Sequence, residues 1–136
     1  MLLLKYLKKS IRSSVVLTNS YVAATVLGPQ GVAPEADPVA NNKLVLFIDF
    51  TIGSLTDARV KVEFSDDGTT YYQETNAGSP SSGVSTLTVN EYEMEATGKF
   101  TVVLDYTARY IKVSAKGTGT VTGSLMAIDA VLAVKP

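Results

Sequence analysis

The sequence KLVLFIDFT, residues 43–51, carries the strongest core signal in the chain. Successive side chains of an extended strand point to opposite faces, so one face of this segment is entirely apolar. That face is made by Leu44, Leu46, Ile48 and Phe50. The opposite face also begins apolar, with Val45 and Phe47, and then carries Asp49. The pattern predicts a central strand that is covered on both sides.

A β-hairpin is predicted directly after this strand. Residues 58–65, ARVKVEFS, alternate between polar and apolar side chains, which is typical of a half-exposed strand. Asp66, Asp67 and Gly68 follow as a turn, because glycine readily adopts the positive φ that tight turns require. The chain then returns, so the hairpin extends over residues 58–74. Both aspartates with Glu63 could bind Ca²⁺, but the turn explains them without a metal.

Further strand signals follow one another at short spacing along the chain. Strands are predicted at residues 13–18, 21–27, 84–90, 98–105 and 109–115. Residues 121–134 are predicted to form one long strand, or two with a bend near Asp129. Residues 116–120, KGTGT, are interpreted as a turn. No helical pattern appears after residue 12, which argues against a parallel sheet with crossover helices. The sequence therefore predicts an all-β fold, an antiparallel β-sandwich, with jelly-roll strand order as the first choice.

The N-terminal segment differs in charge from the rest of the chain. Residues 1–34 hold four basic and no acidic side chains, whereas the remainder holds eight basic and thirteen acidic ones. Residues 1–12 combine an apolar stripe with a basic one, which predicts an N-terminal arm, helical or extended, that contacts a partner. A frayed terminus is the alternative. The expected contact residues are Leu3, Leu4, Lys5, Leu7, Lys8, Lys9, Ile11 and Arg12.

One domain is expected over residues 13–136, and it should stay folded when residues 1–12 are removed. A Pro/Gly loop is predicted at residues 28–42 and a mobile Ser/Gly loop at residues 76–83.

The apolar run at the start is too short for a signal peptide and is followed, not preceded, by its charges. No run is long enough to span a bilayer, and four basic side chains predict no specific nucleic-acid partner.

The composition excludes several kinds of chemistry. The chain has no His and no Cys, so it cannot by itself form a His-dependent catalytic triad, a disulfide or a Cys/His zinc site. Glu91, Glu93 and Glu95 alternate and would share one face of a strand, where paired carboxylates could act on glycosides. A solvated face explains them more simply. The sequence therefore predicts no enzyme, no cofactor and no metal site.

A few polar and aromatic residues remain candidates for specific roles. Asp49 and Asp129 lie within apolar segments, and a buried carboxylate needs a partner. Arg59 and Arg109 are the candidates for these structural ion pairs. Tyr71 and Tyr72 are consecutive, so only one can face the core and the other is a candidate ligand or interface aromatic.

Several segments resemble a group of small β-sandwich proteins from the virions of tailed bacteriophages, called head decoration or minor head proteins. These segments are residues 44–74, ATGKF at 96–100, residues 108–124 and AIDAV at 127–131. The resemblance covers roughly residues 13–134. VEFSDDGTTYY at 62–72 and ARYIKV at 108–113 are also similar to galactose-binding-like jelly rolls. The chain lacks the paired cysteines of many such domains, and Lys112 replaces their second arginine.

The phage resemblance implies a virion structural protein that is made in the host cytoplasm without a signal peptide. It implies capsid decoration, cement or a minor head protein that contacts the major capsid protein or other virion proteins and forms a homo-oligomer in the particle. A head–tail, tail or fibre component is one alternative. Another is a carbohydrate-binding module for a host-surface glycan that uses Tyr71 or Tyr72.

Overall fold

The computed structural model describes residues 5–28, 43–105 and 108–134. Over these residues the chain forms strands and no helix, so none of the described segments could cross a membrane as a helix. Leu3, Leu4 and residues 29–42 of the expected Pro/Gly loop lie outside the described residues. The strands are β1 (Lys5–Val15), β2 (Val22–Ala23), β3 (Lys43–Thr51), β4 (Leu55–Ser65), β5 (Tyr71–Gln73), β6 (Thr75–Ala77), β7 (Leu87–Val89), β8 (Glu91–Met94), β9 (Gly98–Asp105), β10 (Tyr110–Gly119) and β11 (Leu125–Val134).

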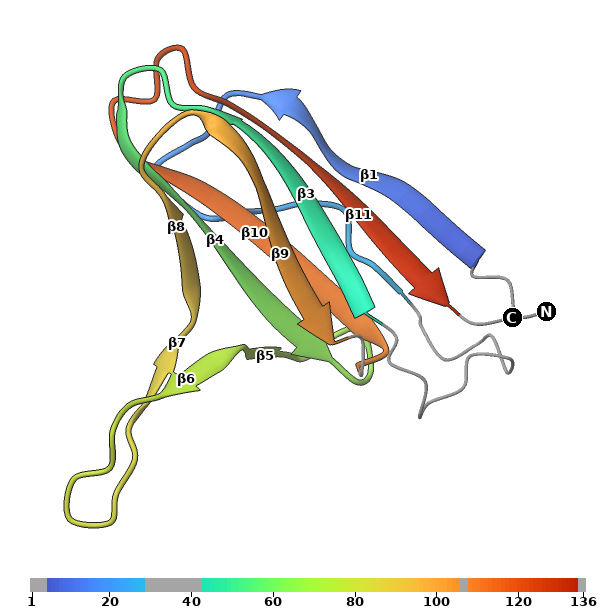
Figure 1. The fold of residues 1–136 in the computed structure, drawn as a ribbon, viewed down its shortest axis with the longest axis vertical. Coiled ribbons are helices and arrows are strands. Elements are labelled where there is room, and N and C mark those ends of the chain that lie inside the picture. The colour runs from blue at the N-terminus through green and yellow to red at the C-terminus, as the bar shows by residue number, and fades with distance from the viewer. Residues whose placement is uncertain (1–4, 29–42, 106–107, 135–136) are drawn as a thin grey trace.

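Two sheets pack face to face in the β-sandwich that the sequence predicts (Figure 1). The first sheet has the order β1-β11-β3-β9. The second sheet has the order β2-β10-β4-β5, and β8 also pairs with β4. Four antiparallel pairs are nested in the chain, with β4–β8 innermost, then β3–β9, β2–β10 and β1–β11. Successive nested pairs alternate between the sheets, which is jelly-roll order.

The core lies between the inner faces of the two sheets. On β3 the four side chains of the predicted apolar face are buried, as the alternation requires. The facing sheet contributes buried Val60, Val62, Ile111 and Val113. β11 adds Met126 and Ile128 beside β3. The segment 43–51 is therefore the central strand that its sequence predicts, and its bounds agree with β3.

The outer face of β3 corrects the prediction of cover on both sides. Phe47 is 48% exposed, and Val103 on the neighbouring β9 is 58% exposed. No described element packs over these side chains, because the second sheet covers only the inner face. An apolar run along one strand therefore indicates a buried face here, but it does not guarantee a second covering layer.

The N-terminal segment belongs to the sandwich over its described part. Residues 5–15 form β1, which pairs antiparallel with β11 at the edge of the sheet. The extended form of the predicted arm is therefore found and the helical form is wrong over residues 5–12. Ile11 is buried, and Arg12 Nε donates a hydrogen bond to the carbonyl oxygen of Met126 at 3.0 Å. Removing residues 1–12 would take Ile11 out of the core and expose one edge of β11. The sandwich therefore includes residues 5–12, which corrects the expected domain boundary at residue 13.

Two turn predictions have different outcomes. The hairpin over residues 58–74 is confirmed as β4–β5, and in its turn Asp67 Oδ1 accepts hydrogen bonds from the backbone N–H of Thr69 and Thr70 at 2.8 Å each. The turn predicted at residues 116–120 is wrong as far as Gly119, because β10 continues to that residue opposite β4. Gly117 is buried in this strand, where a Cβ atom would lie 2.6 Å from Leu55 Cδ2.

The two faces of β3 predict opposite outcomes for neighbouring substitutions. We expect Ile48→Ala to lower the free energy of unfolding by about 2–5 kcal/mol, because it leaves a cavity in the core. Phe47→Ala should cost less than about 1 kcal/mol, because the ring is half exposed. Urea unfolding of both variants measures the difference. Equal losses would show that the outer face is covered after all.

Candidate functional site

A hairpin projects from the sandwich beyond the end of the second sheet (Figure 1). It consists of β6, β7 and the connection between them, residues 75–89, and is called the projecting hairpin below. Its two strands pair only with each other among the described strands. The predicted Ser/Gly loop at 76–83 forms part of it, and Ser81 and Val84 close its tip with a backbone bridge.

The projecting hairpin has one mainly apolar face, on which Thr75 pairs with Val89, and one polar face. Ala77 pairs with Leu87, and Val89, two residues further along β7, lies on the same face. Asn76 and Thr88 form the opposite, polar face. Leu87 is 66% exposed and Val89 45% exposed, although both are aliphatic. Residues 75–90 include no charged side chain, so this exposed face has the composition of a protein contact.

A polar clamp holds the base of the projecting hairpin. Glu74 Oε1 accepts hydrogen bonds from Tyr92 Oη at 2.8 Å and from Asn90 Nδ2 at 2.9 Å. The backbone N–H of Asn90 donates to the carbonyl oxygen of Glu74 at 2.8 Å. Asn90 Nδ2 also lies 3.0 Å from Tyr92 Oη. These bonds join the strands that enter and leave the hairpin, so its direction relative to the sandwich is fixed at the base.

A second exposed apolar surface lies on the outer face of the first sheet. Val45 on β3 lies between Val103 on β9 and Val131 on β11 in the strand register, and Phe47 follows on the same face of β3. These four residues are called the outer patch below. A shallow depression of about 300 Å³ adjoins Phe47 and is also lined by Thr101 and Ala127.

Each carboxylate around the outer patch has a lysine beside it. Asp49 Oδ2 lies 3.9 Å from Lys99 Nζ, and Asp129 Oδ2 lies 3.7 Å from Lys8 Nζ. Both aspartates are exposed to solvent and form ion pairs with lysines, not with the candidate partners Arg59 and Arg109. Charges at the rim of the outer patch are consequently balanced within the chain.

Arg59 lies on the other sheet, where it joins three carboxylates. Its guanidinium nitrogens lie 3.6 Å from Asp57 Oδ1, 3.5 Å from Glu91 Oε1 and 3.5 Å from Glu93 Oε1. Glu91 and Glu93 do share one face of a strand, as their spacing predicts. A hydrogen bond with Asp57 raises the pKa of Glu93, as two adjacent carboxyl groups favour holding a proton.

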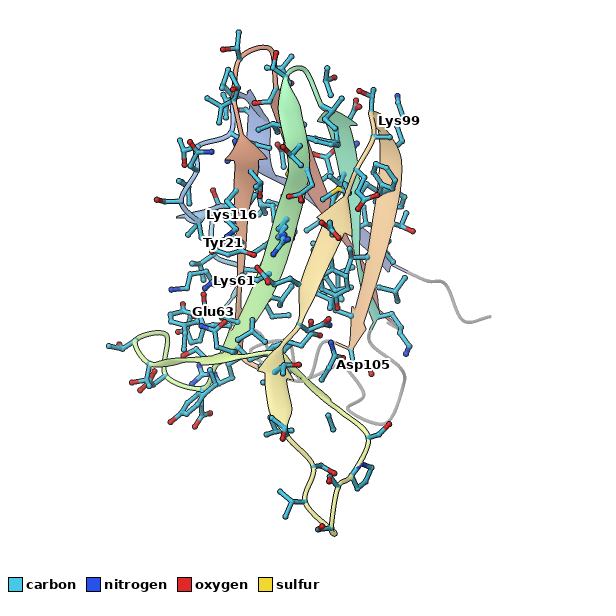
Figure 2. All side chains as sticks on the ribbon, turned by 90° about the vertical axis from the view of Figure 1, so that its left-hand side faces the viewer. Tyr21, Lys61, Glu63, Lys99, Asp105 and Lys116 are labelled. Atoms are coloured by element: carbon cyan, nitrogen blue, oxygen red, sulfur yellow. The ribbon has the colours of Figure 1, made fainter. Side chains whose placement is uncertain are left out.

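Tyr21 completes this polar outer face (Figure 2). Its hydroxyl donates a hydrogen bond to Glu91, and its ring lies 4.7 Å from Lys61 Nζ and 4.9 Å from Lys116 Nζ. Burial and the hydrogen bond with Glu91 raise the pKa of Tyr21. Ion pairs and cation–π contacts link these groups to one another, although the buried atoms Asp57 Oδ1 and Arg59 Nε lack a hydrogen bond among the described residues. Contacts of this kind are the pattern of a structural network.

The two candidate aromatics, Tyr71 and Tyr72, have different environments. Lys112 Nζ lies 4.1 Å from the centre of the Tyr71 ring, so this half-buried ring already has a cation–π partner. Tyr72 is 68% exposed. It borders a depression of about 230 Å³ that Phe64 and Arg109 also line. Of the two, Tyr72 is the residue that is open to a ligand.

The sequence argument missed the projecting hairpin as a contact surface. It placed residues 84–90 in a strand, but it did not identify Leu87 and Val89 as exposed. An uncharged stretch over residues 75–90 that still alternates between apolar and polar residues was the available signal. Within the part of the chain that the structure describes, no three acidic side chains come close enough to hold a metal ion.

Comparison with known proteins gives a structural similarity but no sequence match. The sequence matches no protein-family model and no curated protein. The fold is similar to the crystal structure of SPBc2 prophage-derived protein YomS, with a TM-score of 0.44 and 16% sequence identity. That similarity covers 96% of this chain and 95% of the other.

The clamp predicts an unusual titration for one tyrosine. Burial and the hydrogen bond to Glu74 raise the pKa of Tyr92 to about 12. The protonated phenol therefore stabilises the fold below the ordinary tyrosine pKa of about 10, and this contribution is lost as the pH rises from there towards 12. We expect the ultraviolet difference titration between wild type and Tyr92→Phe to show an ionisation near pH 12. An ionisation near pH 10 would contradict the clamp.

Proposed function

We propose that this chain is a structural protein of a bacteriophage virion that acts through protein–protein contacts, as capsid decoration, cement or a minor head protein. The projecting hairpin is the observation that carries the proposal. It exposes Leu87 and Val89 on an uncharged element whose strands pair with no other described strand. Exposed aliphatic side chains on such an element have no role inside their own fold, and a partner surface would bury them.

The resemblance of the strand segments to phage head proteins supports the virion setting for this contact. A jelly-roll sandwich supplies a rigid body, and the clamp at Glu74 sets the direction of the hairpin. Lys8 and Lys9 are exposed on the edge strand β1 and give the proposed partner contact of the N-terminal segment a basic character. Many copies on one particle would multiply contacts that are weak one by one.

A head–tail, tail or fibre position would use the same contact surfaces, since the fold alone does not specify the site of attachment. The experiment below therefore measures incorporation for the whole particle first and then for separated heads and tails.

We expect Leu87→Asp to reduce the number of copies of this protein on purified particles by tenfold or more, because a charge would have to be buried in the contact. Thr88→Asp is the matched control, since it puts the same charge on the polar face of the same hairpin. Quantitative mass spectrometry of the particles gives the copy number. An unchanged copy number for Leu87→Asp would refute the contact role of the hairpin.

A carbohydrate-binding module is the second candidate function, and the environment of Tyr72 favours it. An exposed ring beside a depression lined by Asp66 and Arg109 combines a stacking surface with hydrogen-bonding groups, which is a common arrangement in sugar sites.

For this candidate we expect Tyr72→Ala to abolish binding on a glycan array, whereas Tyr72→Phe should retain it because the ring remains. The folded state of both variants is checked by circular dichroism. If the wild-type protein binds no glycan on the array, the carbohydrate-binding candidate is rejected.

A further inference from the structure

We infer that the projecting hairpin of one copy docks its apolar face on the outer patch of a second copy of this chain. The inference rests on the proposed function in one respect, the contact role of the hairpin. It adds the identity of the partner. The surface formed by Ala77, Leu87 and Val89 would cover the surface formed by Val45, Phe47, Val103 and Val131.

None of the described strands pairs with the hairpin or extends it into a larger sheet. An isolated two-stranded ribbon is marginally stable in water, and a ribbon with one apolar face gains stability when that face is covered. Leu87 and Val89 are both exposed, and the hydrogen bonds around Glu74 fix only the base of the ribbon. The apolar face therefore requires a sheet or a groove as its covering surface.

The outer patch has the matching chemistry. Its centre is apolar, with Phe47 and Val103 exposed, and its rim carboxylates are already balanced by Lys8 and Lys99. The hairpin brings no charge of its own. Contact between the two surfaces would therefore bury apolar side chains without leaving any charge unpaired, which is the composition expected at the centre of a protein interface.

The spacing of the side chains also agrees. Leu87 and Val89 are two residues apart on one face of β7, as Val45 and Phe47 are on β3. Side chains two apart on a strand repeat about every 7 Å, so the two rows can interdigitate as stacked sheets do.

The contact has to form between molecules. The hairpin projects from the second sheet, whereas the outer patch lies on the outer face of the first sheet (Figure 1). Lys99 and Asp105 mark the two ends of β9 (Figure 2), and the outer patch lies between them on the face of the first sheet that is turned away from the second sheet. The two surfaces consist of different residues, so the association is head-to-tail and produces a ring or an open row of copies.

A mixing experiment tests the pairing of the two surfaces. Light scattering of the full chain should give a mass above that of one 14.4 kDa chain, rising with protein concentration. Leu87→Asp removes the hairpin surface and Phe47→Asp removes the outer patch, and each variant alone should be monomeric. Their mixture should form a dimer, because one variant retains a hairpin and the other retains an outer patch.

Thr88→Asp is the control and should associate like wild type, because it charges only the polar face of the hairpin. Circular dichroism confirms that all variants are folded. Association that survives Phe47→Asp but not Leu87→Asp would overturn the inference in favour of contacts between two hairpins. Two monomeric variants that fail to form a dimer when mixed would also overturn it.

The outcome separates this inference from the proposed function. A wild-type chain that is monomeric at every concentration, together with a loss of Leu87→Asp from particles, would reject the second copy as partner and keep the virion contact. A monomeric chain whose particle copy number is also unchanged in Leu87→Asp would reject both.

Discussion

Burial of one face of β3 against the opposite sheet is the constraint on which the rest of the structure depends. Leu44, Leu46 and Ile48 must point inwards together, because the side-chain period of a strand is two and a shift by one residue would expose all of them. The same register fixes the outer face of the sheet. Burial of Leu46 and Ile48 therefore places Phe47 outside, so the core itself creates the outer patch.

The two sheets have outer faces of different character. On the outer face of the second sheet, Arg59 and its neighbouring carboxylates form a network whose partners all come from the same chain. On the outer face of the first sheet, apolar side chains remain exposed between charges that are paired with one another. A polar face whose charges are already paired within the chain gains little from a partner, whereas an apolar face gains when water is removed from it. The first sheet is therefore the better candidate for association.

The projecting hairpin arises between β5 and β8, which pair with successive parts of β4. The chain leaves β5 and returns in β8, and Glu74, Asn90 and Tyr92 close the gap with hydrogen bonds. Glu74 is 16 residues from Asn90, and the three residues form no motif, so the clamp could not be predicted. The exposure of Leu87 could not be predicted either. An alternating segment predicts a strand with an apolar face, but distant segments of the chain decide whether that face is covered.

The apolar run by itself determined the strand at 43–51, and alternation determined the hairpin at 58–74, because both patterns are local properties of the chain. The succession of such segments determined the all-β class. Residues 1–12 were ambiguous, since a spacing of four, as between Leu7 and Ile11, fits one face of a helix and one face of a strand alike. Pairing with β11 settled the strand over its described part. Ion-pair partners, the uncovered side of β3 and the open face of the hairpin were decided only by the tertiary structure, because each depends on which distant segment lies alongside.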